Sequence, residues 1–138
     1  MRVIIGGAGR VGTELAKTLR AEEMDVVLVD SDSRAVKNAQ NLDVLVIHGD
    51  LTTREKLHEA GIGEAEVFVA ATNSDERNLL ACALAEHAHY QYGGSKAKPL
   101  LSISRVRSLN FMQEQQEGHL TGWAKVNHVV NPLDSAIK

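Results

Sequence analysis

The sequence predicts an α/β fold: a doubly wound, Rossmann-like parallel sheet of about six strands in the order 3-2-1-4-5-6. Two observations predict it. Short runs rich in valine, isoleucine and leucine alternate along the chain with helix-length stretches. A helix between two strands returns the chain to the same edge of a sheet, so the strands pair in parallel. The runs are also almost continuously apolar, which is typical of strands with helices on both faces.

The elements follow from this pattern in chain order. The apolar, β-branched runs predict strands over residues 2–6, 25–30, 43–48, 66–71, 99–106 and 124–130. Amphipathic or alanine-rich stretches between them predict helices over residues 11–20, 33–41, 52–61, 74–89 and 108–116, with a last one starting at Pro132. Residues 89–98 contain two glycines, two lysines and no periodicity, so we expect an exposed loop there.

Two helix starts have the spacing of a capping box. Thr52 precedes Glu55, and Asn73 precedes Glu76, so each first residue is expected to cap its helix. Gly61 is expected to end the helix that begins near Thr52.

Length and composition restrict the class of protein. The 138 residues suit one domain. The net charge of −3 disfavours nucleic-acid binding, which needs a basic surplus. The apolar runs fall far short of the ~20 residues that cross a bilayer, so we expect no membrane insertion and a cytoplasmic location. The single cysteine, Cys82, is expected to be buried, and the scattered histidines predict no metal site.

A glycine motif lies between the first strand and the first helix. Residues 7–12 read G-x-G-x-x-G. Gly7 would permit the tight turn, Gly9 would let a diphosphate approach the backbone, and Gly12 would let helix and strand pack closely. The free amides of the helix start would then face the phosphates. Asp30 ends the second strand at about the expected ~20-residue spacing and would accept hydrogen bonds from the adenosine ribose.

Asp30 also favours NAD over NADP, because its carboxylate would repel a 2′-phosphate. The alternative is a glycine turn that binds nothing. Arg10, within the motif, either lies near the phosphates or points to solvent. Asp32 and Arg34 are expected to cap the next helix and to lie on its solvated face. Alternatively, Arg34 is the residue that would matter if NADP is not excluded.

Polar residues at other strand ends would share the edge of the glycine motif, where ligands of open parallel sheets bind. Asp50 would contact the adenine side or serve as a turn residue. Thr72 and Asn73 would contact ribose or phosphate or cap the next helix. Arg105 would bind a phosphate through its guanidinium or lie at the surface.

Together the stretches VIIGGAGRVG, VVLVD, VIHGD, ATNSDERNLLACALA and SISRV resemble RCK domains (regulators of potassium conductance), also called TrkA-N domains. The resemblance covers nearly the whole chain. It implies a cytosolic regulatory domain of a potassium channel or Trk/Ktr-type transporter, at the inner face of the membrane through its partner. It also implies dimers or rings, and NAD(H) or ATP and ADP as ligands. The residues implied in nucleotide binding are Gly7, Gly9, Arg10, Val11, Gly12, Asp30, Asp50, Leu51, Thr72, Asn73 and Arg105.

The resemblance extends to the stretch after the fourth strand, where Asp75, Glu76 and Asn78 match a DE-x-N pattern. The family normally continues from its last helix to a second lobe. We therefore expect residues 1–138 to be a single nucleotide-binding domain of a longer subunit.

Three classes of function are compatible with these residues. The first is a nucleotide-sensing regulatory domain without enzymatic activity. The second is the cofactor-binding domain of an NAD-dependent oxidoreductase, which would need a general acid or base near the nicotinamide. No histidine or lysine lies in a recognisable catalytic stretch, which favours regulation. The third is an interaction domain with a vestigial site, which the set Asp30, Asp50 and Arg105 disfavours.

Overall fold

The computed structural model describes residues 1–131, which build one six-stranded sheet in the order β3-β2-β1-β4-β5-β6. Every neighbouring pair of strands is parallel. The strands are β1 (Arg2–Gly6), β2 (Asp25–Asp30), β3 (Leu45–His48), β4 (Val67–Ala70), β5 (Leu101–Arg105) and β6 (His128–Val130). The predicted fold class and strand order are confirmed.

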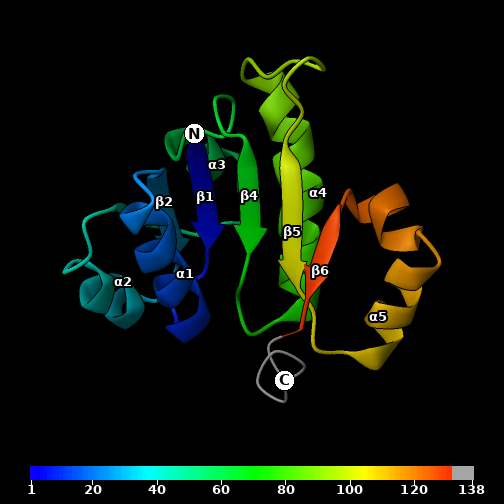
Figure 1. Cartoon of the computed structure of the whole chain (residues 1–138), viewed down its shortest axis with the longest axis horizontal. Helices are drawn as coiled ribbons and strands as arrows, with labels where there is room; N and C mark the ends of the chain where they lie inside the picture. The colour runs from blue at the N-terminus through cyan, green and yellow to red at the C-terminus, as the bar shows by residue number, and fades with distance from the viewer. Residues whose placement is uncertain (132–138) are drawn as a thin grey trace.

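Helices cover both faces of the sheet. They are α1 (Arg10–Ala21), α2 (Ser33–Ala39), α3 (Arg54–Glu59), α4 (Asp75–Gln91), α5 (Leu109–Gln116) and a short π-helix, η1 (Leu120–Ala124). Figure 1 shows α1 and α2 in front of the sheet and α4 behind β5. No helix among residues 1–131 is both long and apolar enough to cross a membrane.

Two apolar cores hold these layers together, because successive strand residues point to opposite faces. Ile4 and Phe68 belong to the core beneath α3 and α4, which also contains the buried thiol of Cys82. Burial raises the pKa of this thiol to about 12, so it stays protonated and packs as a small apolar group. Val3 and Ile5 belong to the core beneath α1 and α2.

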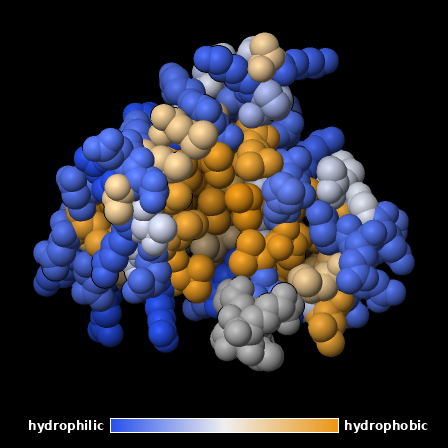
Figure 2. Space-filling model, viewed as in Figure 1, coloured by the Kyte–Doolittle hydropathy of each residue, from blue (hydrophilic) through white to orange (hydrophobic). Residues whose placement is uncertain are grey.

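One apolar part of the sheet is not covered by any described helix. Figure 2 shows hydrophobic residues gathered over the middle of the sheet, between α1 and α5. Val67 and Ile103 are half-buried there, whereas Leu101 is exposed. The front of β4 and β5 is therefore less protected than the front of β1 and β2.

Both capping-box predictions are wrong. The cap of α3 is Thr53, and Thr52 instead donates its hydroxyl to Asp50, 2.6 Å away. The cap of α4 is Ser74, whose hydroxyl accepts from the amide of Arg77 at 3.2 Å. In each case the first helical turn begins one residue later than the spacing predicts, because the predicted cap has another partner: Thr52 bonds to Asp50, and the side-chain oxygen of Asn73 accepts from Arg105.

The predicted last strand is also too long. Most of the segment before His128 belongs to η1 and to the turn after it, where Lys125 has a positive φ of 61°. The predicted loop at residues 89–98 starts later than expected, because α4 continues to Gln91. The helix predicted from Pro132 lies outside the described residues.

Candidate functional site

A cleft of about 870 Å³ lies at the carboxyl ends of the central strands. Its volume is in the range of small-molecule sites. It is lined by Gly7, Gly9, Arg10, Val11, Glu14, Asp30, Ser31, Asp32, Ala35, Leu51, Ala71, Thr72, Asn73, Arg77 and Arg105. The glycine motif, the ends of β2 and β5 and the loops after β3 and β4 therefore meet at one place, as the topology requires.

The three glycines of the motif have different surroundings. Gly7 has a φ of +113°, and a Cβ there would lie 2.9 Å from the backbone of Ala71. A Cβ on Gly12 would collide with the carbonyl oxygen of Gly7, so this position lets α1 lie against β1. A Cβ on Gly9 would meet no atom of the described residues within 4 Å, because Gly9 faces the open cleft. Two glycines serve packing and one keeps the cleft open.

The first turn of α1 presents its backbone amides to the cleft. Its N-cap is Gly9, which has no side chain to accept from them. Arg10 and Val11, the first two helical residues, both line the cleft. The positive end of the helix dipole is therefore available to an anion at this point.

Asp30 is held by the backbone around it. One carboxylate oxygen accepts from the amide of Ala8 at 2.7 Å, and the other accepts from the amide of Asp32 at 2.8 Å. The side chain is partly buried and lines the cleft. Each oxygen keeps further acceptor capacity, so Asp30 is positioned to accept hydrogen bonds from hydroxyl groups of a ligand.

The opposite end of the cleft is built by a side-chain network centred on the buried Asn78. Its amide oxygen accepts from the amide and the hydroxyl of Thr72 at 3.0 and 2.6 Å. Its amide nitrogen donates to the carbonyls of Thr72 and Arg105 at 3.1 and 2.9 Å. Asn78 therefore ties the loop after β4 to the end of β5.

Arg105 and Asp75 extend this network in opposite directions. The guanidinium of Arg105 donates to the side-chain oxygen of Asn73 at 3.1 Å and lines the cleft. The carboxylate of Asp75 accepts from the amides of Arg107 and Ser108 at 2.9 and 2.8 Å, just before α5. Asp75 and Asn78, the two buried residues of the DE-x-N stretch, thus tie α4 to the segment before α5 and to the end of β5. Arg105 itself faces the cleft.

Arg77 is the main site residue that the sequence analysis missed. It lies in the first turn of α4 and reaches Asp50, whose carboxylate oxygen is 2.7 Å from the guanidinium. The same oxygen accepts from the hydroxyl and the amide of Thr52. The hydrogen bonds from Thr52 first, and then Arg77, hold the pKa of Asp50 below its usual value, so Asp50 is ionised at neutral pH.

Most of the predicted site residues lie together. The cleft is lined by Gly7, Gly9, Arg10, Val11, Asp30, Leu51, Thr72, Asn73 and Arg105. Gly12 lies beneath the helix, and Asp50 lies beside the cleft and reaches it through Arg77. Besides Arg77, the lining residues that were not predicted are Glu14, Ser31, Asp32, Ala35 and Ala71. Asp32 caps α2 by accepting from the amide of Arg34, which confirms the helix cap expected there.

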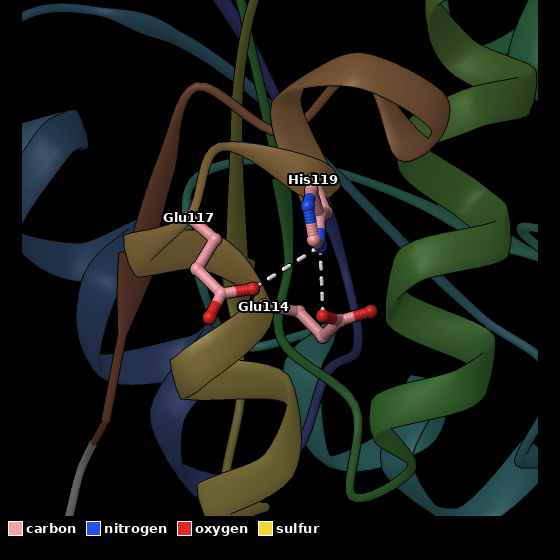
Figure 3. A group of neighbouring side chains, drawn as sticks. All are labelled: Glu114, Glu117 and His119. Carbon is pink, nitrogen blue, oxygen red and sulfur yellow. Dashed lines mark hydrogen bonds and ion pairs between the residues drawn. The ribbon is translucent and has the colours of Figure 1, made fainter.

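A separate group of ionisable side chains follows α5. Glu114, Glu117 and His119 point toward one another (Figure 3), and one ligand atom from each lies within 4.8 Å of the others. His119 Nδ1 is 2.8 Å from Glu114, and this hydrogen bond raises the pKa of His119. All three side chains are about half exposed, and none lines the cleft. Their mutual ion pairs account for the arrangement, and the predicted absence of a metal site stays a prediction.

Comparisons with known proteins identify the family that this sequence matches. A sequence model of the TrkA-N domain matches residues 3–132. The Trk system potassium uptake protein TrkA of Vibrio alginolyticus is 32% identical over 133 residues, which are 96% of this chain and 27% of that protein. A TrkA homolog of Methanothermobacter thermautotrophicus is 48% identical over 85 residues, which are 61% of this chain and 39% of that protein. The chain thus spans well under half the length of these relatives.

Solved structures share the fold over almost the whole chain. The TrkA-N domain of the Escherichia coli inner membrane protein ybaL has a TM-score of 0.78 at 17% identity, covering 99% of this chain and 90% of that one. The carboxyl-terminal domain of Shewanella denitrificans Kef in its AMP-bound form has a TM-score of 0.72 at 23% identity, covering 99% and 76%. The GsuK channel bound to NAD has a TM-score of 0.68 at 18% identity, covering 94% and 21%. From the match of the family model and the six-stranded sheet, we conclude that this chain belongs to the TrkA-N domain family.

Proposed function

We propose that the cleft binds NAD(H) or another adenine nucleotide, and that this domain regulates a potassium transporter or channel. One observation carries the proposal. The uncapped start of α1, the open position at Gly9 and the carboxylate of Asp30 all face a single cleft. A diphosphate-linked adenosine needs this combination of a phosphate cradle and a ribose acceptor.

Each part of the ligand has a complementary group in the cleft. The diphosphate would lie on the amides at the start of α1, next to Arg10. The adenosine ribose would bond to Asp30, and the base would lie near Leu51, which borders the cleft. Thr72 and Arg105 would meet the second half of a dinucleotide. A 2′-phosphate on the ribose would face the charge of Asp30, which favours NAD over NADP.

The similar structures support adenine-containing ligands. GsuK has been solved with NAD and the Kef domain with AMP, both at low sequence identity. The preference for NAD(H) over ATP and ADP is part of our proposal. It rests on the length of the cleft, which runs from Asp30 at β2 to Arg105 at β5 and crosses the glycine motif.

Binding without turnover is the activity that fits the lining of the cleft. Among the described residues that line it there is no histidine, the side chain that most often transfers protons near neutral pH, and the carboxylates of Asp30 and Asp32 accept from backbone amides. Regulation needs only a difference in nucleotide affinity between two conformations of an assembly. The relatives named as Trk potassium uptake proteins support a role in potassium transport. We propose that the domain works in a cytoplasmic homo-oligomer that acts on a membrane partner.

Calorimetric titration tests nucleotide binding. We expect the chain to bind NADH and NAD, and the variant Asp30→Ala to lose at least about tenfold in affinity, the effect of one hydrogen bond to a charged group. The matched control is Asp43→Ala, which removes an exposed carboxylate outside the cleft. No binding of NAD, NADH, ADP or ATP at millimolar concentration would contradict the proposal.

Native mass spectrometry tests the proposed assembly. The purified chain should appear as a dimer or a larger ring that carries nucleotide. A strictly monomeric chain at all concentrations would remove the oligomeric part of the proposal and leave nucleotide binding to the titration.

A further inference from the structure

The two arginines on the β4–β5 side of the cleft differ in how their charges are balanced. Arg77 forms an ion pair with Asp50, and both side chains are 43% exposed. Arg105 donates to two neutral groups, the side-chain oxygen of Asn73 and the carbonyl of Thr72. The cleft therefore contains one compensated and one uncompensated guanidinium on this side.

The ion pair of Arg77 is held in place at both ends. Asp50 accepts from Thr52 through the amide and the hydroxyl, so its carboxylate cannot turn without losing these bonds. The backbone amide of Arg77 donates to Ser74, the cap of α4. Because the pKa of Asp50 lies below its usual value, the carboxylate keeps its charge at neutral pH.

Arg105, unlike Arg77, has no acidic partner among residues 1–131. Its Nε is buried and has no hydrogen-bond partner among residues 1–131. The ion pairs found in this part of the chain do not include Arg105. Its positive charge is therefore available to an anion in the cleft, whereas an anion that approaches Arg77 also meets the negative charge of Asp50.

We infer that the pair Asp50–Arg77 determines which class of nucleotide the cleft accepts. It favours a dinucleotide, whose diphosphate is a bridge, over ADP and ATP, which carry an additional terminal phosphate. An additional terminal phosphate brings more negative charge than the one uncompensated guanidinium on this side, Arg105, can balance, and the charge of the other, Arg77, is neutralised by Asp50. Asp50 thus acts through Arg77 as a positioning and charge-balancing residue. This inference rests on the proposed binding of nucleotides.

The test is the ratio of the affinities for ATP and NADH, measured by calorimetry in four forms of the chain. Asp50→Asn keeps an oxygen that accepts from Thr52 and removes the charge, so it should raise the ATP to NADH ratio about 10- to 100-fold. Arg77→Met leaves Asp50 uncompensated and should lower the ratio about tenfold or more. The double variant has neither charge, so its ratio should rise above that of Arg77→Met but stay below that of Asp50→Asn, which keeps a free guanidinium.

The matched control is Asp43→Asn, which changes the net charge equally at an exposed site outside the cleft and should leave the ratio unchanged. Thermal unfolding of each unliganded variant reports its folding, and Arg77→Met keeps the test available if Asp50→Asn does not fold.

Three results would overturn the inference. An unchanged ratio in Asp50→Asn, with NADH still bound by the parent chain, would overturn it alone. An equal loss of ATP and NADH affinity in Asp50→Asn would mean that Asp50 contacts the adenosine directly. A parent chain that binds neither nucleotide would overturn the proposed function and this inference with it.

Discussion

One half of the cleft is formed mainly by backbone groups, and the other half is formed mainly by polar side chains. The half around β1, α1 and β2 consists mainly of backbone: glycines, the uncapped turn of α1, and amides that hold Asp30. The half around β4, α4 and β5 is held by polar side chains that bond to one another and to the backbone, with Asn78 at the centre. The structure of the first half depends on glycines that let backbone segments lie close together. The structure of the second half depends on hydrogen bonds between its polar groups.

This difference indicates how each half can fail. A methyl group added at Gly7 or Gly12 destabilises the first half, since the neighbouring backbone leaves no room for it, whereas one added at Gly9 fills the cleft. Removing a polar atom harms the second half, since its former partners are left buried and unsatisfied. The variants below test this distinction.

Asn78→Ala should have the largest effect on stability. Asn78 is fully buried, and its loss leaves the groups of Thr72 and the carbonyl of Arg105 without their partners. We expect a loss of about 3 kcal/mol in the free energy of unfolding, measured by urea denaturation. The matched control, Asn38→Ala, changes an exposed residue of α2 and should cost less than about 0.5 kcal/mol. Equal losses in the two variants would contradict the role of the network.

Gly12→Ala should destabilise the fold less, by about 2 kcal/mol, since its Cβ would press on the carbonyl of Gly7.

Gly9→Ala should lower the free energy of unfolding by under about 1 kcal/mol, since its Cβ points into open space. The same Cβ occupies the cleft, so Gly9→Ala should weaken NADH binding even though the chain stays folded. Thermal unfolding and calorimetry separate the two effects. A Gly9→Ala variant that binds NADH as well as the parent would remove Gly9 from the site.

Arg105→Met should affect ligand binding more than stability. The lost guanidinium should weaken NADH binding about tenfold, the contribution of one charge-assisted hydrogen bond. Arg20→Met is the control, since Arg20 forms an exposed ion pair with Asp43 outside the cleft. If both variants bind NADH like the parent in calorimetry, Arg105 has no contact with the nucleotide.

The smallest effect is expected outside both halves, at His119. Its hydrogen bond with Glu114 raises its pKa, so any stability from this pair is present below the ordinary histidine pKa of about 6.5. That contribution is lost as the pH rises through the raised value. Glu114→Gln should lower the pKa of His119 toward 6.5 in an NMR titration and leave NADH affinity unchanged. A pKa that does not move would mean that Glu114 is not its partner in solution.

The same contrast explains what the sequence could predict. The glycine motif and Asp30 were predictable because strand, turn and helix follow one another directly, and the spacing to Asp30 is a property of one βαβ unit. Strand order followed from the alternation of elements. The caps at Thr53 and Ser74 were not predictable from spacing, because the predicted caps Thr52 and Asn73 bond instead to Asp50 and Arg105.

Arg77 and Asn78 show the limit most clearly. Asn78 meets Arg105, and Arg77 meets Asp50, in both cases 27 positions away along the chain. Only the folded sheet brings these residues together, and no local pattern marks them as partners. Asp50 was predicted at the site, but its link to the cleft through Arg77 depends on that long-range contact.

A crystal structure of the chain with NADH tests the central claim most directly. We predict the diphosphate within hydrogen-bond distance of the amides of Arg10 and Val11, close to Gly9. The adenosine ribose should bond to the carboxylate of Asp30, with the other half of the ligand extending toward Arg105. NADH bound elsewhere, or a side chain lying across Gly9 with Asp30 turned from the ribose, would contradict the account.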